Sequence, residues 1–267
     1  MSFTISLTGV TSFQRIPFLH PNKKTALAYN ALATVLAGLE AVSHRLHERV
    51  LVYSAASEED NRWFNVQVAI SEVWEIMDAM RRAQRFWPFV KLSGADVQTR
   101  RIMGDIKDIR DSFQHLDERL EHYFQNAGDS VFGDIYWRYR SQAGANEEVF
   151  TWATGVTRGP ADFTKAKVQP NDVRFLNCTG VYDFNLIYIK REPGQKGNKI
   201  PKHAYIQVSL DEAADIFNRV ILQLEQQSTG LLQQWQREHG PDGIPQHGLP
   251  PIVIRLRSHQ EGNQTVP

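Results

Sequence analysis

Apolar residues recur at intervals of three and four along the first half of the chain, which is the spacing of one buried face of an α-helix. The pattern predicts helices over about residues 24–50, 57–86 and 96–124, the second capped by Ser57. The third stretch is the most regular, with apolar side chains at Ile102, Ile106, Ile109, Phe113, Leu116, Leu120 and Tyr123. Such a narrow apolar seam is typical of a helix that packs in a bundle.

The second half of the chain changes to short runs of aromatic and β-branched residues, which favour strands. We expect strands in "IYWRYR", "VFTWATGVT", "VRFLNC", "FNLIYIK" and "HAYIQVS". Residues 177–183 are expected to form a turn between the third and fourth of these. Ser209 and Glu212 form a capping box ahead of a closing helix that should end at about Glu238. The sequence therefore predicts a mainly α, α+β fold with a β insertion at about residues 135–208, before the last long helix.

One domain is expected over residues 1–239, because the helices and the β insertion would share one apolar core. The first 22 residues are expected to form a strand or an arm. Residues 240–267 are rich in Gly, Pro and Gln, with one possible short strand, and should form a mobile or peripheral tail. A chain of 267 residues is long enough to bury a core of this kind.

Composition narrows the classes of function. Lys plus Arg is 30 and Asp plus Glu is 30, so a net charge of zero argues against whole-molecule electrostatic capture of nucleic acid or membrane. A local basic patch stays possible. The single cysteine, Cys178, excludes an intrachain disulfide and a Cys-based zinc site, and it is expected in the core within "VRFLNC". Without a signal peptide, or an apolar stretch near the roughly 20 residues of a membrane span, we expect a soluble cytoplasmic protein.

Charged residues crowd one face of the third predicted helix. At about 100° per residue, its seam leaves Lys107, Asp111, His115 and Glu118 on the opposite face, and Arg110 at the flank. Asp111 and His115 are four residues apart, so the carboxylate can raise the pKa of the imidazole and orient the ring. Arg110 and His115 point about 140° apart on an ideal helix. They face one groove only if the helix is distorted, or if a second subunit supplies the facing pair across a two-fold axis.

The run "RDSFQHLDERL" resembles the Arg-x4–6-His signature of HEPN domains, with Arg110 and His115 at its shortest spacing. Asp111 stands where Asn is common, and Gln114 stands where an acidic residue is usual. The spacing alone occurs about twice by chance in such a chain. The second match, Arg15 to His20, contains a proline and lies outside the helical pattern. The helical context and the following "LDERL" distinguish the first match.

This resemblance implies a HEPN-like helical bundle and a metal-independent ribonuclease without a cofactor, acting as a homodimer with both motifs in one cleft. His115 would move a proton to or from the 2′-hydroxyl or the leaving oxygen. Arg110 would bind the phosphate and stabilise its charge, and Asp111 would orient either residue. By family analogy alone, the setting is a toxin or phage defence. The alternatives are a non-catalytic HEPN-like module that binds a protein or nucleotide partner, and an unrelated helical protein.

Two other groups of residues are candidates for binding. A basic connection between two predicted strands could contact an RNA backbone, or could be an ordinary solvated loop. Its cations are Lys190, Arg191, Lys196, Lys199 and Lys202. His44 and His47 lie three residues apart on the first predicted helix, near two glutamates. A metal site needs more converging ligands, so we expect these histidines at the surface and no metal.

Overall fold

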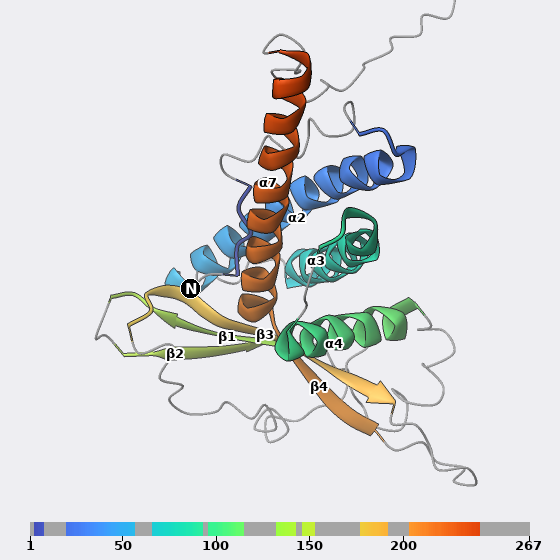
Figure 1. Cartoon of the computed structure of the whole chain (residues 1–267). Coiled ribbons are helices and arrows are strands. Elements are labelled where there is room, and N and C mark those ends of the chain that lie inside the picture. The colour runs from blue at the N-terminus through green and yellow to red at the C-terminus, as the bar shows by residue number, and fades with distance from the viewer. Residues whose placement is uncertain are drawn as a thin grey trace, which may run out of the picture.

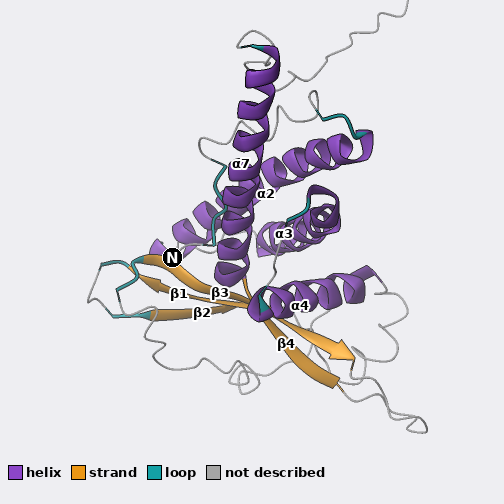
Figure 2. Cartoon of the chain, in the orientation of Figure 1, coloured by secondary structure: helices purple, strands orange, loops and turns teal. Residues whose placement is uncertain are grey.

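The computed structural model describes residues 3–7, 20–56, 66–92, 96–114, 132–142, 146–152, 177–191 and 203–240. These described residues form four α-helices, a short 3-10 helix and one four-stranded sheet, so the expected mainly α, α+β fold class is confirmed (Figures 1 and 2). The helical elements are α2 (Lys23–Ala55), α3 (Val66–Phe86), η2 (Trp87–Val90), α4 (Val97–Gln114) and α7 (Leu210–His239). The expected cap Ser57, residues 115–124 and the tail after Gly240 lie outside the described residues.

The four strands form one antiparallel sheet in the order β2-β1-β3-β4. They are β1 (Asp134–Arg140), β2 (Glu148–Trp152), β3 (Gly180–Arg191) and β4 (His203–Ser209). The β element precedes the last helix, as the sequence predicts. Ser209 ends β4 and caps α7, since its Oγ accepts a hydrogen bond from Glu212 N at 3.3 Å. The predicted N-cap Ser209 is thus confirmed at the point where strand changes to helix.

The start of β3 differs from the expectation. Cys178 is half-buried and lies before the strand, not in it, and residues 180–183 belong to β3 although a turn was predicted there. Glycine and aspartate are turn residues because they tolerate positive φ. Here Gly180 (φ 75°) begins the strand, and Asp183 (φ 52°) lies where the register between β1 and β3 shifts. The same backbone preference therefore produces a β-bulge instead of a turn.

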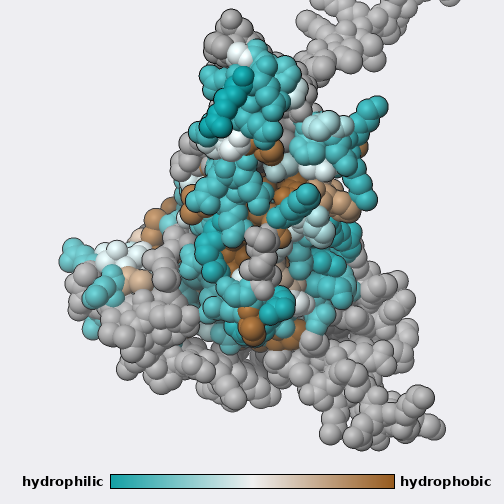
Figure 3. All heavy atoms as spheres, viewed as in Figure 1, coloured by the Kyte–Doolittle hydropathy of each residue, from teal (hydrophilic) through white to brown (hydrophobic). Residues whose placement is uncertain are grey.

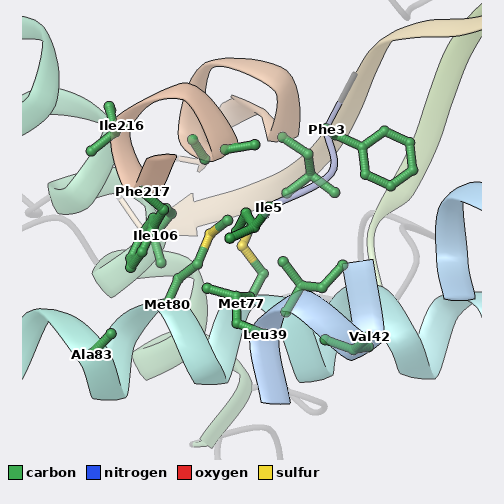
Figure 4. Packing of buried hydrophobic residues seen from close by; sticks show 14 of the residues in the cluster. Phe3, Ile5, Leu39, Val42, Met77, Met80, Ala83, Ile106, Ile216 and Phe217 are labelled. Atoms are coloured by element: carbon green, nitrogen blue, oxygen red, sulfur yellow. The ribbon is translucent and has the colours of Figure 1, made fainter. Parts of the chain in front are cut away.

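The N-terminal segment, residues 3–7, joins α2 to α7 as an extended arm. Ile5 N donates to Ser43 Oγ on α2 at 3.1 Å, and Ser6 N donates to Asn218 Oδ1 on α7 at 3.1 Å. The side chain of Ile5 is fully buried and lies beside Met77 and Met80 of α3 (Figure 4). The arm therefore contributes buried side chains to the core that it shares with these helices.

One hydrophobic cluster takes in side chains from all four α-helices, the arm and the sheet. The N-terminal part of α7 lies against the sheet, and its C-terminal part projects away from the sheet (Figure 1). On the face shown in Figure 3, hydrophilic side chains cover most of the described residues, with smaller hydrophobic areas among them.

The helix α2 is long and apolar enough to cross a membrane by length and composition, although no such segment was predicted from the sequence. One stripe of this helix is buried in the hydrophobic cluster, and the length and composition alone are weak evidence of a membrane span, because the core helix of a soluble protein and a signal sequence both pass the same test. The fully buried members of the stripe are Leu32, Leu36, Leu39, Val42, Leu46 and Val50.

Candidate functional site between helices α3 and α4

Burial of the apolar seam sets the rotation of α4 and therefore the place of its charged residues. Ile106 and Ile109 are fully buried. Arg110 follows Ile109 at the edge of this face, and its side chain is 15% exposed, whereas that of Asp111 is 39% exposed. Lys107 lies on the exposed side and its Nζ is 4.0 Å from Asp111 Oδ2. These positions agree with the helical wheel.

Arg110 joins α4 to α3 through an ion pair. Its Nε donates to Asp78 Oδ1 at 3.1 Å, and its Nη1 lies 3.9 Å from Asp111 Oδ1. Asp78 is also paired with Arg82, one turn further along α3. Asp78 therefore has a second cationic partner on its own helix.

Two more arginines of α3 follow Asp78 by three and seven residues, so helical spacing places them on the same side of α3 as Asp78. Arg81 and Arg85 are one helical turn apart, so their side chains share a face of α3. Burial lowers the pKa of Arg81, the nearby Arg85 and Arg110 lower it further, and Asp111 opposes them. An arginine stays protonated at neutral pH despite such a shift. We call Arg81, Arg85 and Arg110 the arginine cluster.

The hydrogen bonds of Arg81 are incomplete. Its Nη1 donates to Gln84 Oε1 at 2.6 Å. Its Nε is buried and has no acceptor among the residues that the structure describes. A buried donor of this kind costs free energy, so the site is more favourable when an acceptor or an anion approaches it.

The structure does not bring all the predicted site residues together. His115 lies outside the described residues, so its pairing with Asp111 stays a prediction. Lys190 and Arg191 lie at the end of β3, where they pair in register with Ala204 and His203 of β4. Their side chains are not described. Lys196, Lys199 and Lys202 lie outside the described residues.

The two histidines of α2 differ from each other in environment. His44 is exposed as expected, but His47 is half-buried and lies edge-on to Phe3 at 5.4 Å. Burial lowers the pKa of His47, and His44 lowers it further. Within the described residues no group of three His, Cys, Asp or Glu side chains is placed to hold a metal ion.

A polar network on the sheet was not predicted from the sequence. Arg138 Nε donates to Asp183 Oδ2 at 2.9 Å, and its Nη1 donates to Glu147. Tyr182 Oη donates to Glu147 Oε2 at 2.6 Å, and Arg140 Nη2 donates to Oε2 at 3.2 Å. Alternation along "YWRYR" places Arg138 and Arg140 on the same side of β1, a signal that was available. Glu147 pairs with both arginines, and Asp183 pairs with Arg138.

Asp78 and the arginines of α3 were also missed. The available signal was the run "MDAMRRAQR" at the end of the second predicted helix, which has three arginines within five residues. Neither its spacing nor its composition indicates that α4 packs beside it. No protein-family model matches the chain, and no curated protein or solved structure is significantly similar to it. The charges between α3 and α4 are therefore the basis for a functional proposal.

Proposed function

We propose that this protein is a soluble, cytoplasmic, metal-independent ribonuclease of HEPN type, with a HEPN-like helical bundle as its fold. Its catalytic residues are Arg110, His115 and Asp111. The observation that supports the proposal is the arginine cluster, in which Arg110 is accompanied by Arg81 and Arg85 at the edge of the α3–α4 contact. Guanidinium groups provide the positive charge and the paired N–H donors that a phosphodiester requires.

The reaction needs only side chains of this chain. His115 removes the proton of the ribose 2′-hydroxyl, and the 2′ oxygen attacks the adjacent phosphorus. The bond from phosphorus to the 5′ oxygen breaks, and that oxygen receives a proton. The products are a 2′,3′-cyclic phosphate and a 5′-hydroxyl. Arg110 stabilises the charge that develops on the phosphate oxygens.

A homodimer is part of the proposal for a geometric reason. Arg110 and His115 point about 140° apart on a straight helix, so one protomer cannot easily present both to the same phosphate. A two-fold axis beside α4 places His115 of one protomer opposite Arg110 of the other.

Cleavage of total tRNA and of a labelled single-stranded RNA in excess EDTA tests this function. The variants are His115→Ala, which removes the base, and Arg110→Lys, which keeps a cation for Asp78 but loses the planar donor fork. We expect loss of cleavage in both, and thermal unfolding checks that each variant is folded at the assay temperature. Equal cleavage by the wild type and both variants would assign the activity elsewhere.

The alternative is a non-catalytic HEPN-like module that binds a protein partner or a nucleotide. It is favoured by the Arg110–Asp78 ion pair, whose side chains are only 15% and 29% exposed, as expected for an arginine that joins two helices. Absence of cleavage by a folded wild-type dimer, across several RNAs, would favour this alternative over the ribonuclease.

A further inference from the structure

The arginine cluster holds three cations, of which Arg110 alone forms an ion pair between α3 and α4 among the described residues. Arg110 forms an ion pair between the two helices, with Asp78. Burial lowers the pKa of Arg81, and the nearby like charges of Arg85 and Arg110 lower it further. The Nε of Arg81 is also buried without an acceptor among the described residues. An anion near the three guanidinium groups would relieve both the repulsion and the unsatisfied donor.

We propose that Arg81 and Arg85 of α3 form, together with Arg110 of α4, a subsite for one backbone phosphate of RNA, and that Asp78 is displaced from Arg110 when the phosphate binds. The choice of RNA as the source of the phosphate rests on the proposed ribonuclease function. Arg81 and Arg85 are positioning residues here, since they bind the backbone and leave proton transfer to His115.

Asp78 makes this exchange favourable because it has two cationic partners. The displaced carboxylate keeps its ion pair with Arg82, one turn along the same helix. The phosphate then replaces it at Arg110, where the side chain is 15% exposed and the pair is open to solvent at its edge. No carboxylate is left buried and unpaired, which would otherwise oppose the exchange.

Two kinds of substitution change binding in opposite directions. Arg81→Gln and Arg85→Gln remove a cation that binds the phosphate, so each should weaken binding about tenfold. Asp78→Asn removes the competing carboxylate, so it should tighten binding about threefold. A purely structural role for Asp78 predicts lower stability without tighter binding.

Matched controls exist for both kinds. Glu75→Gln removes the same charge from α3, three residues earlier, where Glu75 pairs with Arg45 at 3.2 Å. Arg219→Gln removes a guanidinium of α7 that pairs with Asp96 at 3.4 Å, at the opposite end of α4 from Arg110. Both controls should bind RNA within about twofold of the wild type.

The experiment measures binding of a fluorescent single-stranded 2′-O-methyl oligoribonucleotide by anisotropy, over a series of salt concentrations. This probe lacks the attacking hydroxyl, so binding is measured independently of cleavage. Removal of an arginine from the subsite should also lower the slope of log K against log salt by about 0.7 for each phosphate that the variant no longer neutralises. Thermal unfolding checks that each variant is folded.

The proposed subsite is refuted if Arg81→Gln and Arg85→Gln bind the probe as tightly as Arg219→Gln does, with an unchanged salt slope. It is also refuted if the wild type does not bind the probe. Ordinary RNA is tested in parallel for cleavage. Binding that depends on Arg81 without any cleavage would refute the ribonuclease and leave the subsite. Cleavage unaffected by loss of Arg81 or Arg85 would refute the subsite and leave the ribonuclease.

Discussion

Arg110 on α4 donates from its Nε to Asp78 Oδ1 on α3 at 3.1 Å, and this contact joins two helices across 32 residues of sequence. Both side chains are partly buried, so the pair is shielded from solvent more than an exposed ion pair is. The same arginine is the proposed phosphate ligand. Stability and activity must therefore be separated whenever Arg110 is changed.

We expect Arg110→Ala to lower the free energy of unfolding by about 1–2 kcal/mol, because Asp78 loses one cation but keeps Arg82. Arg110→Lys should retain more than half of that stability, since a lysine ammonium can still pair with Asp78. Urea denaturation of the three proteins measures the difference. Equal stability of all three would mean that the ion pair contributes nothing to the fold.

Ser54→Ala is expected to destabilise the protein by about 1–3 kcal/mol. Trp137 Nε1 donates to Ser54 Oγ at 2.8 Å, and the Trp137 side chain is fully buried. Without the hydroxyl, the indole N–H is left buried and unsatisfied. Thr34→Ala is the matched control, since Thr34 Oγ1 donates to Asn30 O at an exposed position of the same helix. Thermal unfolding should show a loss for Ser54→Ala and none for Thr34→Ala.

Asp211 should make stability depend on pH. Burial raises its pKa to about 7 from the usual 3.8, with Asp183 adding to the rise, although Phe184 N donates to its Oδ2 at 2.7 Å. Because the pKa of Asp211 is higher in the folded state, the folded protein binds the proton more tightly than the unfolded chain does. The contribution of protonated Asp211 to folding stability is therefore fully present below pH 3.8 and is lost as pH rises through 7.

The test compares wild type with Asp211→Asn in urea denaturation between about pH 4 and pH 8. Wild type should lose about 1–4 kcal/mol more stability over this range than the variant, which has no proton to release there. Parallel profiles for the two proteins would show that Asp211 does not titrate in this window.

Arg138→Met is expected to destabilise the protein by about 3 kcal/mol, because the Arg138 side chain is 6% exposed and lies between Glu147 and Asp183. Its loss leaves two carboxylates partly buried near each other. The matched control is Arg219→Met, which removes an exposed cation and should cause no measurable change. If both variants unfold at the same temperature, the network contributes little to stability.

Sequence patterns predicted a helix or its start correctly where interactions between residues close in the sequence determine it. The apolar seams predicted the helices because burial of one face imposes a period of 3.6 residues. Ser209 marked the start of α7 because its Oγ needs only a backbone N–H three residues away. The prediction of a turn over residues 177–183 was wrong for residues 180–183. Positive φ at Gly180 and Asp183 is compatible with a strand start and a β-bulge as well as with a turn.

The sequence by itself determined that Arg110 lies at the edge of a buried helix face, since the position of Ile106 and Ile109 sets the rotation of α4. Only the tertiary structure decided which groups meet Arg110 there. Asp78 is 32 residues away in the chain, and no periodicity relates the two. The physical reason is that helix packing depends on the summed burial of many apolar side chains, whereas the charges at the edge of the contact follow from that packing.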